Sequence, residues 1–150
     1  MKKNLLIAKI LLTIGVLEFF GPLLKDTGSS HIMNGEWVGH AKVHLAWLLG
    51  YLFFSGLVNL YFIWVRQPFK LSHLYLSCLW QATHLAGFWA GILFVPVYGG
   101  AIVDHRYHTS ILGIDENIFV FSFLSIVLVI AYFWLKTKVE PLYDSSQITA

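Results

Sequence analysis

Residues 117–135 read NIFVFSFLSIVLVIAYFWL, a run that contains no Asp, Glu, Lys or Arg. About 20 apolar residues in a helix cross roughly 30 Å of hydrocarbon, so this run predicts a membrane-spanning helix. Three further apolar runs have a similar character, and they occupy residues 4–24, 40–65 and 71–95. Because lipid offers the backbone no hydrogen-bond partner, each run is expected to be helical. The sequence therefore predicts an all-α, polytopic four-helix membrane bundle in a single domain, 1–150.

The composition agrees with a membrane location. Hydrophobic residues make up 57% of the 150 residues and charged residues only 12%, and the mean hydropathy is +0.69. A soluble domain carries about 25% charged residues, so membrane lipids are the expected surroundings of this chain. The composition excludes a disordered chain, a coiled coil and an ordinary cytosolic enzyme, and the net charge of +2 is too small to indicate a nucleic-acid partner.

The ends of the chain and the loops predict an orientation. The first run resembles a signal peptide in following two lysines, but it contains Lys9 and Glu18 and lacks a small-residue cleavage site, so we interpret it as a retained helix that ends at Gly21-Pro22. Six Lys and Arg residues lie at the N-terminus, in the 66–70 turn and in the C-terminal tail, against three in or beside the two longer loops. The positive-inside rule then places both termini in the cytoplasm, across a plasma membrane or a bacterial inner membrane.

Polar side chains recur along the second and third runs at steps close to a helical turn. In the second run they are His40, His44, Tyr51, Ser55 and Asn59. In the third run they are His73, Ser77, Gln81 and His84. Such spacing keeps side chains on one face of a helix, and polar groups within a membrane normally face the bundle interior. We therefore expect the two stripes to face each other.

Two glycines in the third run add a packing motif. Gly87 and Gly91 have the Gly-x-x-x-Gly spacing, which permits close approach of helices. The motif fits contacts within the bundle, which we favour, or contacts between the protomers of a homo-oligomer.

A carboxylate within hydrocarbon must be paired or protonated, so Glu18 is singled out. By depth, its expected partners are Lys42 and His44, and His84 is expected nearby in the outer half of the bundle. Glu18 is then either a general acid or base or one half of a structural ion pair. The residues predicted to carry the chemistry are Glu18, His40, His44 and His84.

Five of the seven histidines are expected on the outer side, and they are His31, His40, His44, His105 and His108. Two imidazoles four residues apart on a helix can bind one metal ion. The metal interpretation assigns His40, His44 and His108 as ligands of a divalent transition metal. A haem held between His44 and His84 is a less favoured interpretation. The alternative to both is a set of interfacial histidines that bind loops and lipid headgroups.

Residues 26–44, DTGSSHIMNGEWVGHAKVH, resemble a signature of an uncharacterised family of small four-helix membrane proteins. In that family an S/T-H-x-x-N-x-x-W-x-x-H-A-x-x-H run lies between the first two spans. The matching residues are His31, Asn34, Trp37, His40, Ala41 and His44. The family often has Pro near the tryptophan, where this chain has Gly35 and Gly39. The layout is also similar to that of DoxX-like proteins in its number of spans. The resemblance implies that this loop and the start of the second helix form the site, and it implies no reaction.

A ligand is expected to contact residues of this loop and of the polar stripes. The predicted ligand-binding residues are His31, Asn34, Trp37, Trp47, Tyr51 and Gln81. Ionisable groups that gather at one depth indicate a site, whereas a channel would spread them across the membrane. We therefore expect a small integral-membrane enzyme or ligand-binding protein that acts on a lipophilic small molecule. The alternatives are a transporter or channel component for a solute, metal or proton, and an accessory subunit of a membrane complex.

Overall fold

The computed structural model describes residues 1–143 and is mostly helical (74%). Residues 144–150, which belong to the predicted single domain, lie outside the described part. The helices are α1 (Lys2–Gly15), α2 (Leu17–Asp26), α3 (Gly39–Leu60), α4 (Leu71–Leu93), α5 (Val95–Tyr98) and α6 (Glu116–Trp134). Two π-helical turns, η1 (Tyr61–Val65) and η2 (Leu135–Val139), continue α3 and α6. The strands β1 (Ser110–Ile111) and β2 (Ile114–Asp115) form a short antiparallel hairpin before α6.

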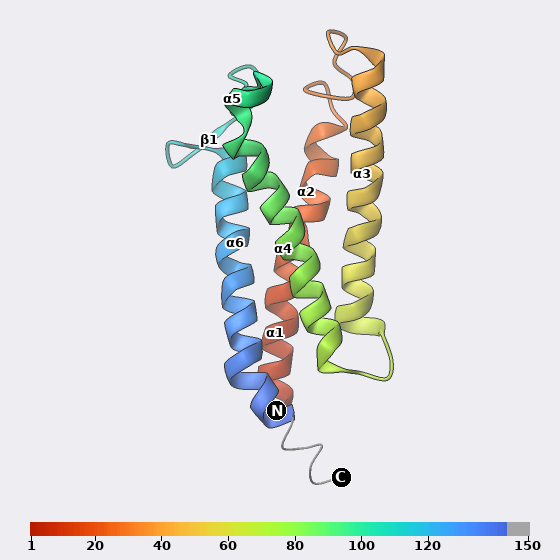
Figure 1. Cartoon of the computed structure of the whole chain (residues 1–150), viewed down its shortest axis with the longest axis vertical. Helices are drawn as coiled ribbons and strands as arrows, with labels where there is room; N and C mark the ends of the chain where they lie inside the picture. Colours follow the sequence, from red (N-terminus) through yellow and green to blue (C-terminus); the bar gives the residue numbers. More distant parts are fainter. Residues whose placement is uncertain (144–150) are drawn as a thin grey trace.

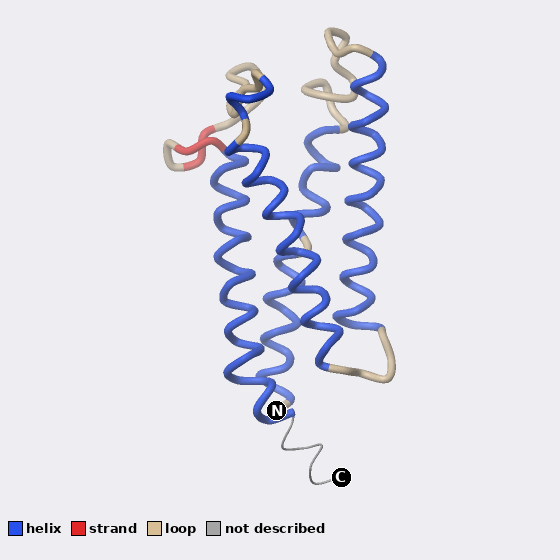
Figure 2. Tube along the Cα trace, viewed as in Figure 1, coloured by secondary structure: helices blue, strands red, loops and turns tan. Residues whose placement is uncertain are grey.

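The long helices run along a common axis (Figures 1 and 2). The N-terminus and the end of α6 lie at one end of the molecule, and the loops 27–38 and 99–115 lie at the other. Helix α1 packs against α6 and α4, whereas α2 packs mainly against α3. Helix α3 and α4 approach each other mainly at η1, beside the 66–70 turn, and they diverge toward the loop end.

Three helical segments are long and apolar enough to cross a membrane, and they are Lys2–Asp26, Gly39–Val65 and Glu116–Tyr143. These segments coincide with the first, second and fourth predicted spans, which confirms the prediction of a helical chain suited to a membrane. Helix α4 occupies the third predicted span, but its polar stripe makes it less apolar than the other three. A crossing by α4 stays a prediction.

The first span does not end at Gly21-Pro22, as predicted, but continues to Asp26. A bend at Val16 separates α1 from α2, where the N–H of Phe19 donates to the carbonyl of Val16. Pro22 lies inside α2 and has no N–H to donate to the carbonyl of Glu18, four residues earlier. Membrane helices tolerate such a proline because neighbouring groups can satisfy the freed carbonyl. The bend and the proline therefore flank the turn that carries Glu18.

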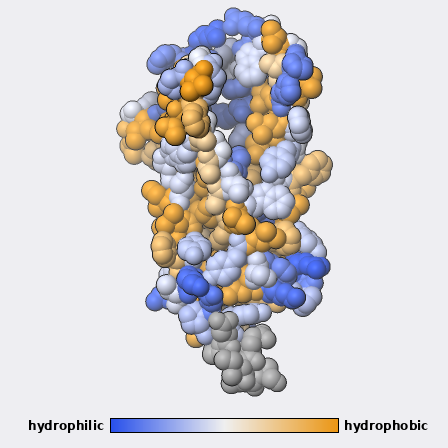
Figure 3. All heavy atoms as spheres, viewed as in Figure 1, coloured by the Kyte–Doolittle hydropathy of each residue, from blue (hydrophilic) through white to orange (hydrophobic). Residues whose placement is uncertain are grey.

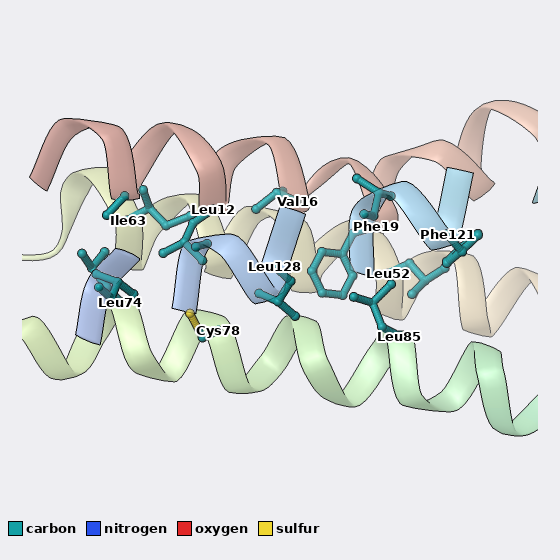
Figure 4. Close-up of a cluster of buried hydrophobic side chains, with 14 of the residues drawn as sticks. Leu12, Val16, Phe19, Leu52, Ile63, Leu74, Cys78, Leu85, Phe121 and Leu128 are labelled. Atoms are coloured by element: carbon teal, nitrogen blue, oxygen red, sulfur yellow. The ribbon is translucent and has the colours of Figure 1, made fainter. Parts of the chain in front are cut away.

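Buried apolar side chains from α1, α2, α3, α4 and α6 fill the centre of the molecule (Figure 4). Among those labelled there are Leu12, Val16, Phe19, Leu52, Leu74, Leu85, Phe121 and Leu128. Small residues let the backbones approach at two points. A Cβ at Gly15 would meet the side-chain amide of Gln81, and a Cβ at Gly56 would lie 2.6 Å from Cζ of Phe20. Close packing of this kind is the main force between helices in lipid.

Gly87 and Gly91 are not such points. In the described chain, a Cβ at either glycine would have no other group of the fold within 4 Å. The expectation that this motif packs inside the bundle is therefore wrong, because no neighbouring helix approaches the α4 backbone at either glycine in the described chain.

Candidate functional site

A cavity of about 1330 Å³ opens between the α2–α3 pair and the α4–α6 pair, at the loop end of the molecule. Figure 3 shows the molecule hollowed at this end. The deeper wall is mostly apolar, with Leu49, Leu52, Phe88, Phe121 and Leu124 among its residues. The mouth is formed by residues 101–108, by Lys25, Asp26 and His31, and by the first turn of α6. The divergence of α3 from α4 thus creates a deep apolar site with a polar entrance.

Glu18 and His84 lie together in the wall of this cavity. Glu18 is 1% exposed, and its Oε1 is 3.7 Å from Nδ1 of His84. The imidazole also lies against aromatic rings, with centroids 5.0 Å from Phe19 and 6.0 Å from Phe121. Within the described chain, neither carboxylate oxygen of Glu18 nor Nδ1 of His84 has a hydrogen-bond partner. A buried carboxylate that lacks a donor is rare enough to require an explanation.

Of the residues that were predicted to lie near Glu18, His84 does so and Lys42 and His44 do not. Lys42 and His44 were expected beside it, but neither lines the cavity in the described structure. His84, the other expected member of the set, is the group that approaches Glu18.

His40 and His44 form a separate, exposed pair at the N-terminal end of α3. Their Nε2 atoms are 3.0 Å apart, and the ring of His44 lies 6.3 Å from that of Trp47. Trp47 is 74% exposed. The prediction that His40 and His44 lie with Glu18 and His84 is therefore wrong for the described structure, and Trp47, predicted to bind a ligand, does not line the described cavity.

Rotation around the axis of α3 does not explain this placement. At 100° per residue, His44 lies within about 20° of both Tyr51 and Ser55 around the helix axis, and Tyr51 lines the cavity. The α3 residues that line the cavity are Leu48, Leu49, Tyr51 and Leu52, so His44 lies about one turn and His40 about two turns beyond them toward the start of the helix.

The two stripes meet, as predicted, in the halves that lie toward the 66–70 turn. The hydroxyl of Ser77 donates to Oδ1 of Asn59 at 2.7 Å, and Asn59 Nδ2 donates to the carbonyl of Ser55 at 2.9 Å. Gln81 Nε2 donates to the carbonyl of Leu12 at 3.1 Å and to Ser77 Oγ at 3.2 Å. Gln81 was predicted to bind a ligand, but it links α4 to α1 and does not line the cavity of the described structure.

The predicted ligand-binding residues of the first loop divide into two groups. His31 and Trp37 line the cavity, with ring centroids 5.1 Å apart, and Tyr51 of α3 joins them in the wall. Asn34 is buried and holds the loop instead. Its Oδ1 accepts from the N–H of Glu36 at 2.8 Å, and its Nδ2 donates to the carbonyl of Ser30 at 3.4 Å.

The two cationic side chains at the mouth of the cavity, Lys25 and Arg106, each form an ion pair there. Lys25 Nζ is 2.9 Å from both carboxylate oxygens of Glu116, which joins α2 to α6. Arg106 contacts Glu36 at 3.2 Å and thereby joins the second long loop to the first. The N–H of Arg106 donates to Oδ1 of Asp104 at 2.9 Å, which holds the pKa of Asp104 below its usual value.

His108 has a local partner. Its Nδ1 is 2.7 Å from Oδ2 of Asp115, and Oδ1 of Asp115 accepts from the N–H groups of Asn117 and Ile118 and so caps α6. Between residues 1 and 143 the structure has no group of three or more His, Cys, Asp or Glu side chains placed to hold a metal ion. The predicted ligand set of His40, His44 and His108 is therefore not assembled.

Sequence reasoning did not select several residues of the cavity wall. Phe88 and Phe121 stack with centroids 3.9 Å apart and rings 7° from parallel. Glu116 accepts hydrogen bonds from Lys25 and, at 2.6 Å, from the hydroxyl of Thr109. The Asp-Glu pair directly before an apolar run was the available signal, because acidic residues favour the first turn of a helix.

No protein-family model, curated protein or solved structure matches the chain. The fold and the site define it only as a helical chain with three segments suited to a membrane and a deep cavity at one end.

Proposed function

We propose that this chain is a small integral-membrane protein that admits a lipophilic small molecule to the cavity, where Glu18 and His84 exchange a proton with it. The observation that carries the proposal is the burial of the Glu18 carboxylate in the cavity wall, 3.7 Å from Nδ1 of His84 and without a hydrogen-bond donor in the described chain. A polar intramembrane group of this kind indicates function more often than structure.

The chemistry follows from the surroundings of the two groups. A carboxylate and an imidazole that share a site can act as a base and an acid on neighbouring atoms of a bound molecule. The apolar part of the wall lowers the local dielectric constant, which strengthens their interaction with charge that develops on the substrate. Isomerisation, cyclisation or hydration of a lipophilic molecule would use such a pair.

The proposed arrangement in the membrane has four crossings, with α4 as the third. Helix α4 is 23 residues long, which is sufficient for about 30 Å of hydrocarbon. The polar groups of its stripe face α1 and α3 rather than lipid. With both termini cytoplasmic, in a plasma or inner membrane, the cavity opens toward the outer side.

Two glycines on α4 provide the test. Gly87 lines the cavity and Gly91 does not, and a Cβ at either position has space in the described chain. The wild type, Gly87→Phe and Gly91→Phe are purified in native lipid nanodiscs, and their bound small molecules are extracted and compared by mass spectrometry. We expect a lipophilic compound that the wild type and Gly91→Phe retain and Gly87→Phe lacks. Identical extracts from all three would refute the cavity as the ligand site.

The acid–base role is tested with the compound so identified. Glu18→Gln should abolish its conversion, whereas His44→Ala should not, because His44 lies outside the cavity of the described structure. Conversion that survives Glu18→Gln would leave a binding function and remove the catalytic one.

One observation favours a second candidate, a transporter or channel component. Gln81, Ser77 and Asn59 extend a buried polar line from the neighbourhood of His84 toward the opposite end of the molecule. A flux of solute or protons in proteoliposomes that Ser77→Leu abolishes would favour this function over the enzyme.

A further inference from the structure

The carboxylates of the cavity wall outnumber its lysine and arginine side chains. The acidic residues of the wall are Glu18, Asp26, Asp104 and Glu116, and the basic ones are Lys25 and Arg106. Four histidines, His31, His84, His105 and His108, also contribute to the wall. A bound molecule therefore enters a site with an excess of acidic side chains.

Both basic side chains already hold carboxylates. Lys25 contacts both oxygens of Glu116 at 2.9 Å, and Arg106 lies 3.2 Å from Glu36 and 3.6 Å from Asp104. An anionic group of a ligand would have to displace one of these carboxylates. Recognition of a phosphate or a carboxylate is therefore disfavoured.

Glu18 is the fully buried carboxylate of the described cavity wall, and neither of its oxygens has a hydrogen-bond donor within the described chain. Leaving a buried acceptor unsatisfied costs free energy, and a buried charge costs more unless it is paired. A protonated amine supplies both the missing donor and the missing charge. Asp26 differs, because its side chain is 26% exposed and therefore open to water.

Aromatic rings lie beside the imidazole that approaches the Glu18 carboxylate. His84, which approaches Glu18, has the ring of Phe121 at 6.0 Å, and Phe121 stacks on Phe88. A cation gains from the face of an aromatic ring, and more so where water is excluded. The same rings offer apolar surface to the uncharged part of a bound ligand.

We infer that the cavity selects lipophilic molecules that carry a protonated amine, with the nitrogen placed at Glu18. This inference rests on the proposed function, because it names the substrate class of the same site. The apolar body of the molecule lies along Leu49 and Leu52 and toward the exposed side chains of Leu17 and Leu48.

Three probes that share one skeleton test the inference: 4-phenylbutylamine, 4-phenylbutan-1-ol and 4-phenylbutyrate. Their dissociation constants are measured by calorimetry with the full chain in phosphatidylcholine nanodiscs, and empty nanodiscs provide the blank. We expect the amine to bind about tenfold more tightly than the alcohol, and the acid to bind most weakly.

Glu18→Gln keeps the size of the side chain and removes its charge, so it should abolish the preference for the amine. Glu140→Gln is the matched control, because it makes the same change at the opposite end of the molecule, where Glu140 contacts Lys136 and Tyr75. If Glu18→Gln does not fold, the comparison of the three probes on the wild type still decides.

The outcomes separate the two proposals. Equal binding of amine and alcohol, lost in Gly87→Phe, overturns the amine inference and leaves the cavity as a site for lipophilic molecules. Preference for the acid, or binding of none of the probes, also overturns the inference. A preference for the amine that Gly87→Phe and Glu18→Gln both remove supports the inference.

Discussion

Gly15→Ala tests the contact between α1 and α4 at which Gln81, a member of the α4 polar stripe, bonds to α1. A Cβ at Gly15 would meet Oε1 of Gln81 and lie 3.1 Å from its Cδ. The Gln81 side chain is fully buried and donates to Leu12 O and Ser77 Oγ, so it cannot turn aside without losing those bonds. The substitution therefore overpacks the contact between α1 and α4 and also disrupts the two hydrogen bonds.

The magnitude follows from three contributions. Two hydrogen bonds at about 0.6 kcal/mol each, the average in a membrane, contribute roughly 1.2 kcal/mol. Overpacking contributes about 1–3 kcal/mol. Ala at a helical position gains about 1 kcal/mol over Gly. We expect Gly15→Ala to lower the free energy of unfolding by about 1–3 kcal/mol.

The assay is unfolding by dodecyl sulfate in mixed micelles, followed by circular dichroism. Gly21→Ala is the control, because Gly21 lies in the same segment and a Cβ there has no group within 4 Å in the described chain. It should stabilise by about 0.5–1 kcal/mol. Gly15→Ala combined with Gln81→Ala should cost less than the sum of the two single changes. A Gly15→Ala variant as stable as Gly21→Ala would refute the reasoning.

Two further predictions concern a hydrogen bond and a loop. Ser77→Ala removes the donor to Asn59 and should destabilise the chain by about 1–2 kcal/mol in the same assay, whereas Ser72→Ala, on an exposed position of the same helix, should change stability little. The N–H of Arg106 donates to Oδ1 of Asp104 and so depresses the pKa of this carboxyl group below its ordinary value of 3.8. The bond therefore stabilises the turn fully above pH 3.8, and this stabilisation is lost as the pH falls through the lowered pKa. Hydrogen exchange of the Arg106 amide should therefore show less protection at low pH in the wild type but not in Asp104→Asn, and a flat profile in both would contradict this.

The polar stripes show how far sequence patterns lead. Spacing alone correctly joined Asn59 to Ser77 and placed Gln81 in the interior. The same spacing misplaced His40 and His44, although they share the angular range of Tyr51 around the axis of α3. The cavity is lined on α3 only from Leu48 to Leu52 in the described structure, and the depth of a cavity along a helix is not recorded in the spacing of polar residues.

The candidate site was predictable in its chemistry and not in its pairing. Glu18 was identified from its cost in hydrocarbon, and His84 from its place on a polar stripe. Their contact depends on the path of α2 beyond the bend at Val16 and on the course of α4, which no local pattern contains. For the same reason the ring pair Phe88–Phe121 could not be anticipated.

The sequence by itself determined the helical segments, because each helix satisfies its own backbone within one stretch of chain and lipid permits no alternative. It also determined which groups are costly to bury, since that depends on side-chain chemistry alone. Only the tertiary structure decided which faces meet. The divergence of α3 from α4 opens the cavity, and the packing of α2 against α3 directs the carboxylate of Glu18 to His84 rather than to Lys42 or His44. Those outcomes depend on the complementary shapes of side chains far apart in the chain, which the hydrophobic pattern does not record.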